Sequence, residues 1–202
     1  MMKQLYLIRH AESLANAGGE SLPDRNIPLS EKGKQQAQAL IHRLPKPHQV
    51  FTSEFLRTQQ TAAPYLQYHG LSAEPLACLN EFSYLPFETI QSLNAEQRRP
   101  FSQQFWQQAE PTLQLSPQVD SFVLFNRRID AFLAFAKQAE NRTVCFTHGI
   151  WLSLLIWRLL GFSSDSSQMM KQFYSWQKTL PMENTAIWVL NDACFITKKS
   201  NS

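Results

Sequence analysis

The chain has 202 residues, of which 44% are hydrophobic and 17% charged, and its formal net charge is +3 at pH 7. This length and composition fit one α/β domain over residues 1–202, and the charge is too small to indicate nucleic-acid binding. The three cysteines are too few and too scattered for a disulfide framework, and no CxxC or HExxH spacing predicts a zinc site. The apolar run at 150–160 is too short to cross a bilayer, and the first strand leaves no room for a signal peptide. We therefore expect a cytoplasmic protein with no membrane partner.

The first half of the chain alternates strand and helix patterns. Residues 4–8 predict a buried strand, and glycines and prolines mark 11–27 as a loop with a helical turn. Ser30 is expected to cap a helix that prolines at 45 and 47 end. We then expect a strand at 50–52, a helix from Ser53 to about Gly70, and a strand at 74–77.

The second half begins with an unusual segment. Residues 86–118 are rich in Gln, Pro and aromatic residues, and we interpret them as a helical cap over the sheet, with an ordinary helical hairpin as the alternative. Further along, the patterns predict a helix at 119–140, a buried strand at 143–147, a helix from Ile150 and an edge hairpin at 186–190 and 194–197.

Strands that alternate with helices indicate a mostly parallel sheet covered on both faces, which is a three-layer α/β/α sandwich. Five polar residues lie at or just after strand ends: Arg9, His10, Arg57, Glu81 and His148. Because the carboxyl ends of parallel strands meet at one sheet edge, we expect these side chains to gather there.

Neighbouring Arg9 and His10 point to phosphate chemistry. The guanidinium is a fork for anionic oxygens, and the imidazole can attack phosphorus while its second nitrogen donates to a carbonyl. The segment from Arg9 to Ser13 reads Arg-His-Ala-Glu-Ser, and with Asn16 it resembles the signature of the histidine phosphatase superfamily. That family includes the cofactor-dependent phosphoglycerate mutases and many small phosphatases. Ala11 replaces its usual Gly, and Ala15 stands where an aromatic residue is common.

The resemblance implies roles for particular residues. His10 would be the nucleophile, Arg9, Arg57 and His148 would bind the phosphoryl oxygens, and Glu81 would be the general acid, with Glu12 and Glu88 as competitors for that last role. Asn16, Ser53, Gly149 and Asn184 would help to line the phosphate site. The alternatives are that Asn16 caps a loop and that Ser53 caps a helix. Asp120-Ser121 near Arg128 resembles a helix start of the same family without its glycine, and we interpret it as a helix N-cap followed by a surface arginine.

The function most consistent with these residues is hydrolysis of a small phosphorylated metabolite through a phosphohistidine, with no metal or cofactor. A phosphoglycerate mutase and a catalytically weak phosphate-binding module are the alternatives. The short chain and the Gln- and aromatic-rich 86–118 segment favour a phosphatase and a substrate with an apolar or aromatic body. A phosphohistidine on another protein stays open as a substrate.

Overall fold

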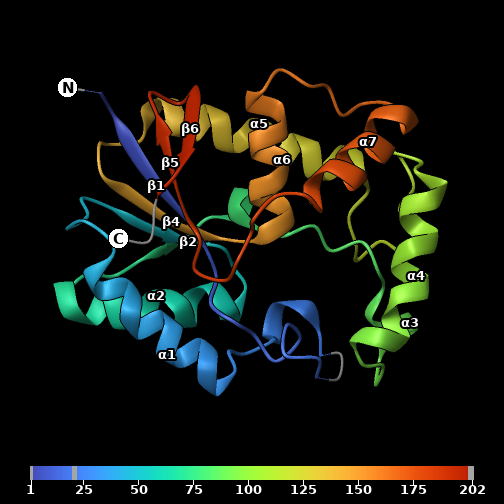
Figure 1. The fold of residues 1–202 in the computed structure, drawn as a ribbon, viewed down its shortest axis with the longest axis horizontal. Coiled ribbons are helices and arrows are strands. Elements are labelled where there is room, and N and C mark those ends of the chain that lie inside the picture. Colours follow the sequence, from blue (N-terminus) through green and yellow to red (C-terminus); the bar gives the residue numbers. More distant parts are fainter. Residues whose placement is uncertain (1, 20–21, 200–202) are drawn as a thin grey trace.

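The computed structural model describes residues 2–19 and 22–199. A six-stranded mixed sheet has the order β3-β2-β4-β1-β5-β6 (Figure 1). Strands β1 to β4 pair in parallel, and β5 and β6 form the antiparallel hairpin expected at one edge. The strand bounds are β1 Gln4–Arg9, β2 Val50–Thr52, β3 Glu74–Pro75, β4 Thr143–Thr147, β5 Ile187–Asn191 and β6 Phe195–Lys198.

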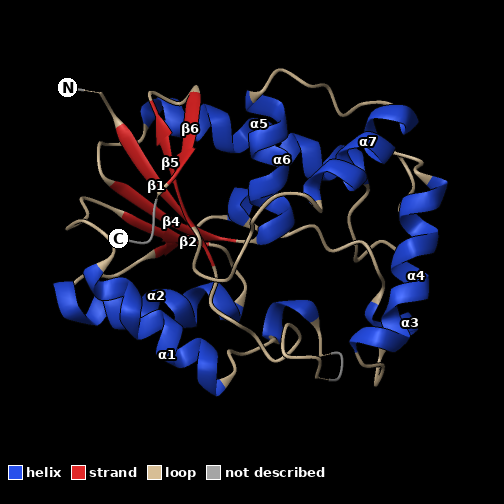
Figure 2. Ribbon diagram, in the orientation of Figure 1, coloured by secondary structure: helices blue, strands red, loops and turns tan. Residues whose placement is uncertain are grey.

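Helices cover both faces of the sheet, which confirms the predicted three-layer sandwich. Helices α1 (Glu31–Ala39) and α2 (Leu56–His69) lie on one face, and α5 (Phe122–Gln138) and α6 (Gly149–Leu159) lie on the other (Figure 2). Side chains of a strand alternate between faces, so Leu7 of β1 joins the core under α5 and α6 while Ile8 joins the core over α1 and α2. Both faces of β1 are buried, which explains its continuous apolar run. No described helix is long and apolar enough to cross a membrane.

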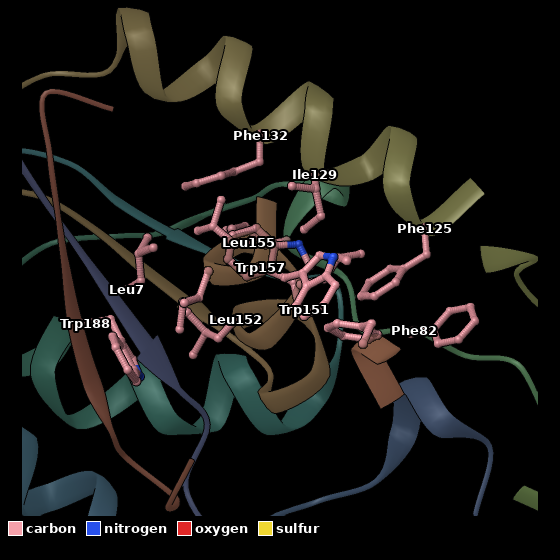
Figure 3. Close-up of a cluster of buried hydrophobic side chains, with 14 of the residues drawn as sticks. Leu7, Phe82, Phe125, Ile129, Phe132, Trp151, Leu152, Leu155, Trp157 and Trp188 are labelled. Atoms are coloured by element: carbon pink, nitrogen blue, oxygen red, sulfur yellow. The ribbon is translucent and has the colours of Figure 1, made fainter. Parts of the chain in front are cut away.

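The core between α5 and α6 holds the start of α6 in place. Figure 3 shows Phe125, Ile129 and Phe132 of α5 facing the aromatic and aliphatic side chains of α6. The rings of Phe132 and Trp151 meet edge to face with centroids 4.7 Å apart, and Trp151 Nε1 donates to the Cys78 carbonyl at 2.7 Å. Truncating a buried aromatic ring of this kind to alanine costs about 3–5 kcal/mol. The residues at the start of α6 are therefore rigidly placed.

Some predicted elements differ from the structure. The helix after β2 begins at Leu56 rather than at Ser53, and β3 is only two residues long. Helix α7, Ser167–Gln177, was not predicted, although its N-cap Ser166 is a recognisable start signal. Its apolar residues Met169, Met170, Phe173 and Tyr174 recur at helical spacing and form one stripe, of which Met170 and Phe173 are buried.

The 86–118 segment contains α3 (Phe87–Ile90) and α4 (Ala95–Gln108), which lie beyond the carboxyl ends of the parallel strands (Figure 1). The underside of α4 is apolar, because Phe105 and Trp106 are buried there. Trp106 stacks on Tyr174 of α7 with ring centroids 4.7 Å apart. The segment is therefore anchored to the domain, and its role as a cap stays a prediction.

Candidate active site

A cavity of about 360 Å³ opens at the carboxyl ends of the strands. We call it the phosphate cavity, after the phosphate site that the sequence predicts for these residues. Its lining includes six of the nine predicted site residues, namely Arg9, His10, Asn16, Arg57, Glu81 and Gly149. The other three, Ser53, His148 and Asn184, are outside that lining and act on residues of the site through hydrogen bonds or ring contacts. The strand-end gathering expected from the sequence is thus present in the fold.

His10 follows β1 directly and is buried, with 4% of its surface exposed. Its Nδ1 lies 2.7 Å from the Ala11 carbonyl oxygen. A carbonyl can only accept, so Nδ1 carries the proton and Nε2 keeps its lone pair. Burial, followed by the charges of Arg57 and Arg9, holds the pKa of His10 well below 6.5. The ring is therefore neutral near pH 7 and oriented as a nucleophile must be.

The Ala11 departure from the family signature is compatible with this geometry. Ala11 is fully buried and is not among the described residues with positive φ. Its backbone N–H donates to Thr61 Oγ1 at 3.0 Å. A side chain at this position therefore needs no backbone conformation that only glycine can adopt.

Arg9 and Gly149 form one unit. The Arg9 guanidinium donates through Nη1 to the Met182 carbonyl, and burial lowers its pKa against the opposing charge of Glu81. A Cβ on Gly149 would lie 3.2 Å from Arg9 Nε, which is shorter than an ordinary van der Waals contact. Gly149 thus lines the cavity as predicted, and its lack of a side chain leaves room for the arginine.

Arg57 is buried near the start of α2 and is held by a residue that the sequence analysis did not assign to the site. Its Nη1 donates to the backbone oxygen of Asp24 at 2.6 Å and to Asp24 Oδ1 at 3.1 Å. The guanidinium carbon lies 4.7 Å from the centroid of the Phe55 ring. Asp24 also accepts from the Ser83 hydroxyl, and it lines the phosphate cavity. Asp24 therefore orients Arg57, leaving Nη2 and Nε outside this contact.

His148 lies behind His10, with the two ring centroids 5.2 Å apart in an edge-on arrangement. Its Nε2 lies 2.8 Å from Ser53 Oγ, which also accepts the Phe55 N–H at 3.1 Å. Burial, and then the charge of Arg57, holds the pKa of His148 well below 6.5, so this ring is also neutral near pH 7. Its Nδ1 has no hydrogen-bond partner within the described part of the chain.

Ser53 thus has a different place from either prediction. It does not line the phosphate cavity, and it does not cap α2, whose N-cap is Phe55 without a side-chain bond. Ser53 Oγ also lies 2.8 Å from Thr58 Oγ1, so the hydroxyl is held on three sides. Its role in the structure is to fix the ring of His148.

Glu81 is placed at the N-terminus of α6. Its Oε1 accepts the N–H groups of Phe82 and Trp151, both at 3.0 Å, and its Oε2 accepts that of Ile150 at 3.1 Å. Burial raises the pKa of this carboxyl, although these hydrogen bonds and the charge of Arg57 oppose the rise. A raised pKa favours a carboxyl that carries a proton to donate.

The two competing carboxylates are elsewhere. Glu12 bonds Ser30 Oγ at 2.8 Å and Lys32 Nζ at 2.9 Å, which is a supporting role in the loop before α1. Glu88 is exposed and is not part of the phosphate-cavity lining. Glu81 is therefore the glutamate that faces His10 across this cavity.

The structure corrects the prediction that Arg128 is a surface arginine. Ser121 caps α5 as expected, but Arg128 is a half-buried residue rather than a surface one. Its Nη1 donates to the Glu81 carbonyl at 2.9 Å, and it binds both Asp120 oxygens at 2.7 and 3.1 Å. A signal was present in the sequence, because Arg128 falls three residues after Phe125 and four before Phe132, on the apolar stripe of the helix.

The two asparagines support the backbone around His10. Asn184 Nδ2 donates to the His10 carbonyl at 3.0 Å and to Asn16 Oδ1 at 3.2 Å. Asn16 also accepts the Ser13 N–H at 3.3 Å, so it caps the loop and lines the cavity at once. No group of three His, Cys, Asp or Glu side chains in the described residues has an arrangement that could hold a metal ion.

The family model described as "Histidine phosphatase superfamily (branch 1)" matches residues 5–180 of this chain. The adenosylcobalamin/alpha-ribazole phosphatase of Escherichia coli (strain K12) is 30% identical over 172 residues, covering 81% of this chain and 82% of the relative. A probable phosphoglycerate mutase of Yersinia pestis (strain Pestoides F) is 28% identical over 176 residues, covering 84% of this chain and 80% of the relative.

Solved structures show the same fold. The alpha-ribazole phosphatase from Shigella flexneri superposes with a TM-score of 0.73 at 24% identity, covering 98% of this chain and 96% of the other. A mycobacterial glucosyl-3-phosphoglycerate phosphatase superposes with a TM-score of 0.71 at 21% identity, covering 98% of both chains. The relatives named as phosphatases share this family and this architecture.

Proposed function

The chain belongs to the histidine phosphatase superfamily, branch 1, and we propose that it hydrolyses small phosphate monoesters through a phosphohistidine on His10. The observation that carries the proposal is that one cavity is lined by an imidazole whose pKa is lowered and by a carboxyl whose pKa is raised. His10 is held neutral with Nε2 free, while Glu81 is a carboxyl whose pKa is raised. A nucleophile and an acid prepared in this way are what ester cleavage requires.

In the first step, the lone pair of His10 Nε2 attacks phosphorus. The N–P bond forms as the P–O bond to the leaving group breaks, and Glu81 gives its proton to the leaving oxygen. Arg9 and Arg57 bind the equatorial oxygens, where the transition state spreads its charge. The positive charge that develops on the imidazole is stabilised by the Ala11 carbonyl at Nδ1.

In the second step, the Glu81 carboxylate takes a proton from water as that water attacks phosphorus. The N–P bond breaks, its electron pair returns to Nε2, and phosphate leaves with the enzyme restored. His148 lies behind His10 as a neutral ring, edge-on to it, and Ser53 Oγ holds this ring through Nε2 at 2.8 Å. Replacing Ser53 by alanine would leave that ring without its orienting bond.

Phosphoryl transfer back to a sugar acid is the second candidate, and the similarity to a probable phosphoglycerate mutase favours it. Both reactions begin with the same phosphohistidine, and they differ in whether water or an acceptor hydroxyl takes the phosphoryl group. The feature against a mutase is the 86–118 segment, which is rich in Gln and aromatic residues.

The test is hydrolysis of p-nitrophenyl phosphate in excess EDTA by the wild type, His10→Ala and His42→Ala. His42 is an exposed histidine and serves as the matched control. We expect activity that survives EDTA, disappears in His10→Ala and persists in His42→Ala, together with an acid-labile phosphoenzyme. Activity that depends on added metal, or that survives in His10→Ala, would contradict the proposal. Phosphoenzyme without turnover, relieved by a phosphoglycerate, would favour the mutase.

A further inference from the structure

A second and larger cavity, of about 620 Å³, adjoins the phosphate cavity. We call it the side cavity. Ala15, Asp24 and Ile27 line both, so the two are continuous at these residues. Resting on the proposed function, we propose that the side cavity binds the leaving group of the substrate, and that this group has a flat apolar body and a second anionic group.

A small side chain lies at the junction of the two cavities. Ala15 is among the residues that line both. The segment that starts at Glu81 continues from the phosphate cavity into the wall of the side cavity, because Phe82 and Tyr84 line the latter. A leaving oxygen beside the Glu81 carboxyl therefore has its carbon body directed along these rings.

The apolar wall of the side cavity is built from rings that other rings hold in place. Tyr84 stacks on Phe105 with centroids 4.6 Å apart, and its hydroxyl lies 2.7 Å from Ser102 Oγ. Tyr174, from α7, stacks on Trp106 at 9° between planes. A cavity of this volume with fixed aromatic walls suits a planar body of small-molecule size.

The charged part of the lining is cationic. Arg98, Arg99 and Lys178 all line the side cavity, and Lys178 Nζ is held 3.5 Å from the centroid of the Tyr174 ring. Asp24 is the single acidic residue of this lining in the described part of the chain, and its carboxylate is engaged by Arg57 and Ser83. The lining therefore favours an anion at the end of the apolar body.

A neighbouring groove, whose lining shares Ser83 and Leu85 with the side cavity, does not fit the same group. Asp24, Glu81, Glu88 and Asp120 all line that groove. Its arginines are already paired with carboxylates, such as Arg128 with Asp120 at 2.7 Å. An anionic leaving group would be repelled there, which directs it to the side cavity.

The test compares three phosphate esters with similar phenol leaving groups. They are phenyl phosphate, the phosphate ester of 3-(4-hydroxyphenyl)propanoate, and the analogue in which an uncharged carboxamide replaces the propanoate carboxylate. Because the leaving groups differ little at the phenol oxygen, differences in kcat/KM report binding of the distal group. We expect the carboxylate to exceed the amide by about tenfold at low salt, since two exposed ion pairs contribute up to about fivefold each.

The paired variants locate the effect. Arg99→Gln with Lys178→Gln should bring the carboxylate-to-amide ratio close to one, and it should also flatten the salt dependence. Arg127→Gln with Lys171→Gln removes the same charge from exposed residues outside the side cavity and should keep the ratio. Equal kcat/KM for carboxylate and amide in the wild type, or equal loss in both double variants, would overturn the inference. If none of the three esters is hydrolysed in a His10-dependent manner, the proposed function fails and this inference fails with it.

Discussion

Replacing Glu81 by glutamine tests the contribution of its acidic proton to catalysis apart from the shape of the side chain. Glutamine has nearly the same shape but carries no acidic proton. We expect kcat/KM for an alkyl phosphate to fall by about 10²- to 10⁴-fold, the usual contribution of a positioned general acid. That loss corresponds to about 3–5 kcal/mol of transition-state stabilisation. For p-nitrophenyl phosphate the loss should be about tenfold or less, because p-nitrophenolate leaves without a proton.

The same substitution has a calculable effect on folding. The carboxylate accepts three backbone N–H groups, two at Oε1 and one at Oε2. The amide nitrogen of glutamine donates and cannot accept, so at least one of these N–H groups loses its partner. An unsatisfied buried donor costs about 1–3 kcal/mol. The free energy of unfolding of Glu81→Gln should fall by that amount.

The assay measures kcat/KM for both esters because this constant reports steps up to phosphohistidine formation, where the leaving group departs. The stability effect is read from urea unfolding of the same samples. Equal losses of kcat/KM for the two esters would refute the acid role. Unchanged stability would refute the hydrogen-bond argument independently.

Three further predictions follow from the geometry. Gly149→Ala should lower kcat/KM about tenfold by displacing the neighbouring arginine, while the thermal midpoint stays equal or rises because alanine favours helix. Gly33→Ala should destabilise the fold by about 3 kcal/mol in urea unfolding, since the new Cβ would lie 2.0 Å from the Glu12 carbonyl oxygen. Below about pH 6.5, His10 and His148 are protonated in the unfolded state but stay neutral in the folded state, because the fold lowers both pKa values. The free energy of unfolding therefore falls as pH falls. Each histidine contributes a slope of up to about 1.4 kcal/mol per pH unit, and the raised pKa of the Glu81 carboxyl opposes this loss, because the folded state binds that proton more readily than the unfolded state.

A control variant or a refuting outcome accompanies each of these predictions. Gln35→Ala lies on the same helix as Gly33 but is exposed, and it should leave the urea midpoint nearly unchanged. Replacing both His10 and His148 by glutamine should remove the loss of stability that begins below about pH 6.5, and leave the loss at lower pH that follows protonation of Glu12, Glu54 and Glu183. An unaltered pH slope in that variant would show that other groups cause it. Unchanged kcat/KM in Gly149→Ala would mean that the arginine does not need this space.

Local pattern was enough to predict most of the layers. Alternating burial and helical spacing identified β1, β2, β4 and the edge hairpin, and also α1, α5 and α6, within a few residues of their ends. These elements form where the apolar period matches the side that the fold buries. Helix α7 was missed although Met169, Met170, Phe173 and Tyr174 recur at helical spacing after the N-cap Ser166, so the local signal was present.

The sequence by itself predicted the candidate reactive groups. The Arg-His motif at the end of the first strand indicated Arg9 and His10, the family resemblance added Arg57 and Glu81, and the fold brings these four into one cavity. This worked because parallel strands place their carboxyl ends together, so a short local motif predicts a three-dimensional neighbourhood.

Only the tertiary structure decided which groups hold the reactive ones in place. Arg57 meets Asp24 across 33 residues, the Glu81 carbonyl meets Arg128 across 47, and Ser53 meets His148 across 95. The continuity of the side cavity with the phosphate cavity at Ala15 is of the same kind. Contacts over such separations are selected by packing of the whole domain, because hydrogen-bond partners are assigned only when folding buries both groups and each must be satisfied.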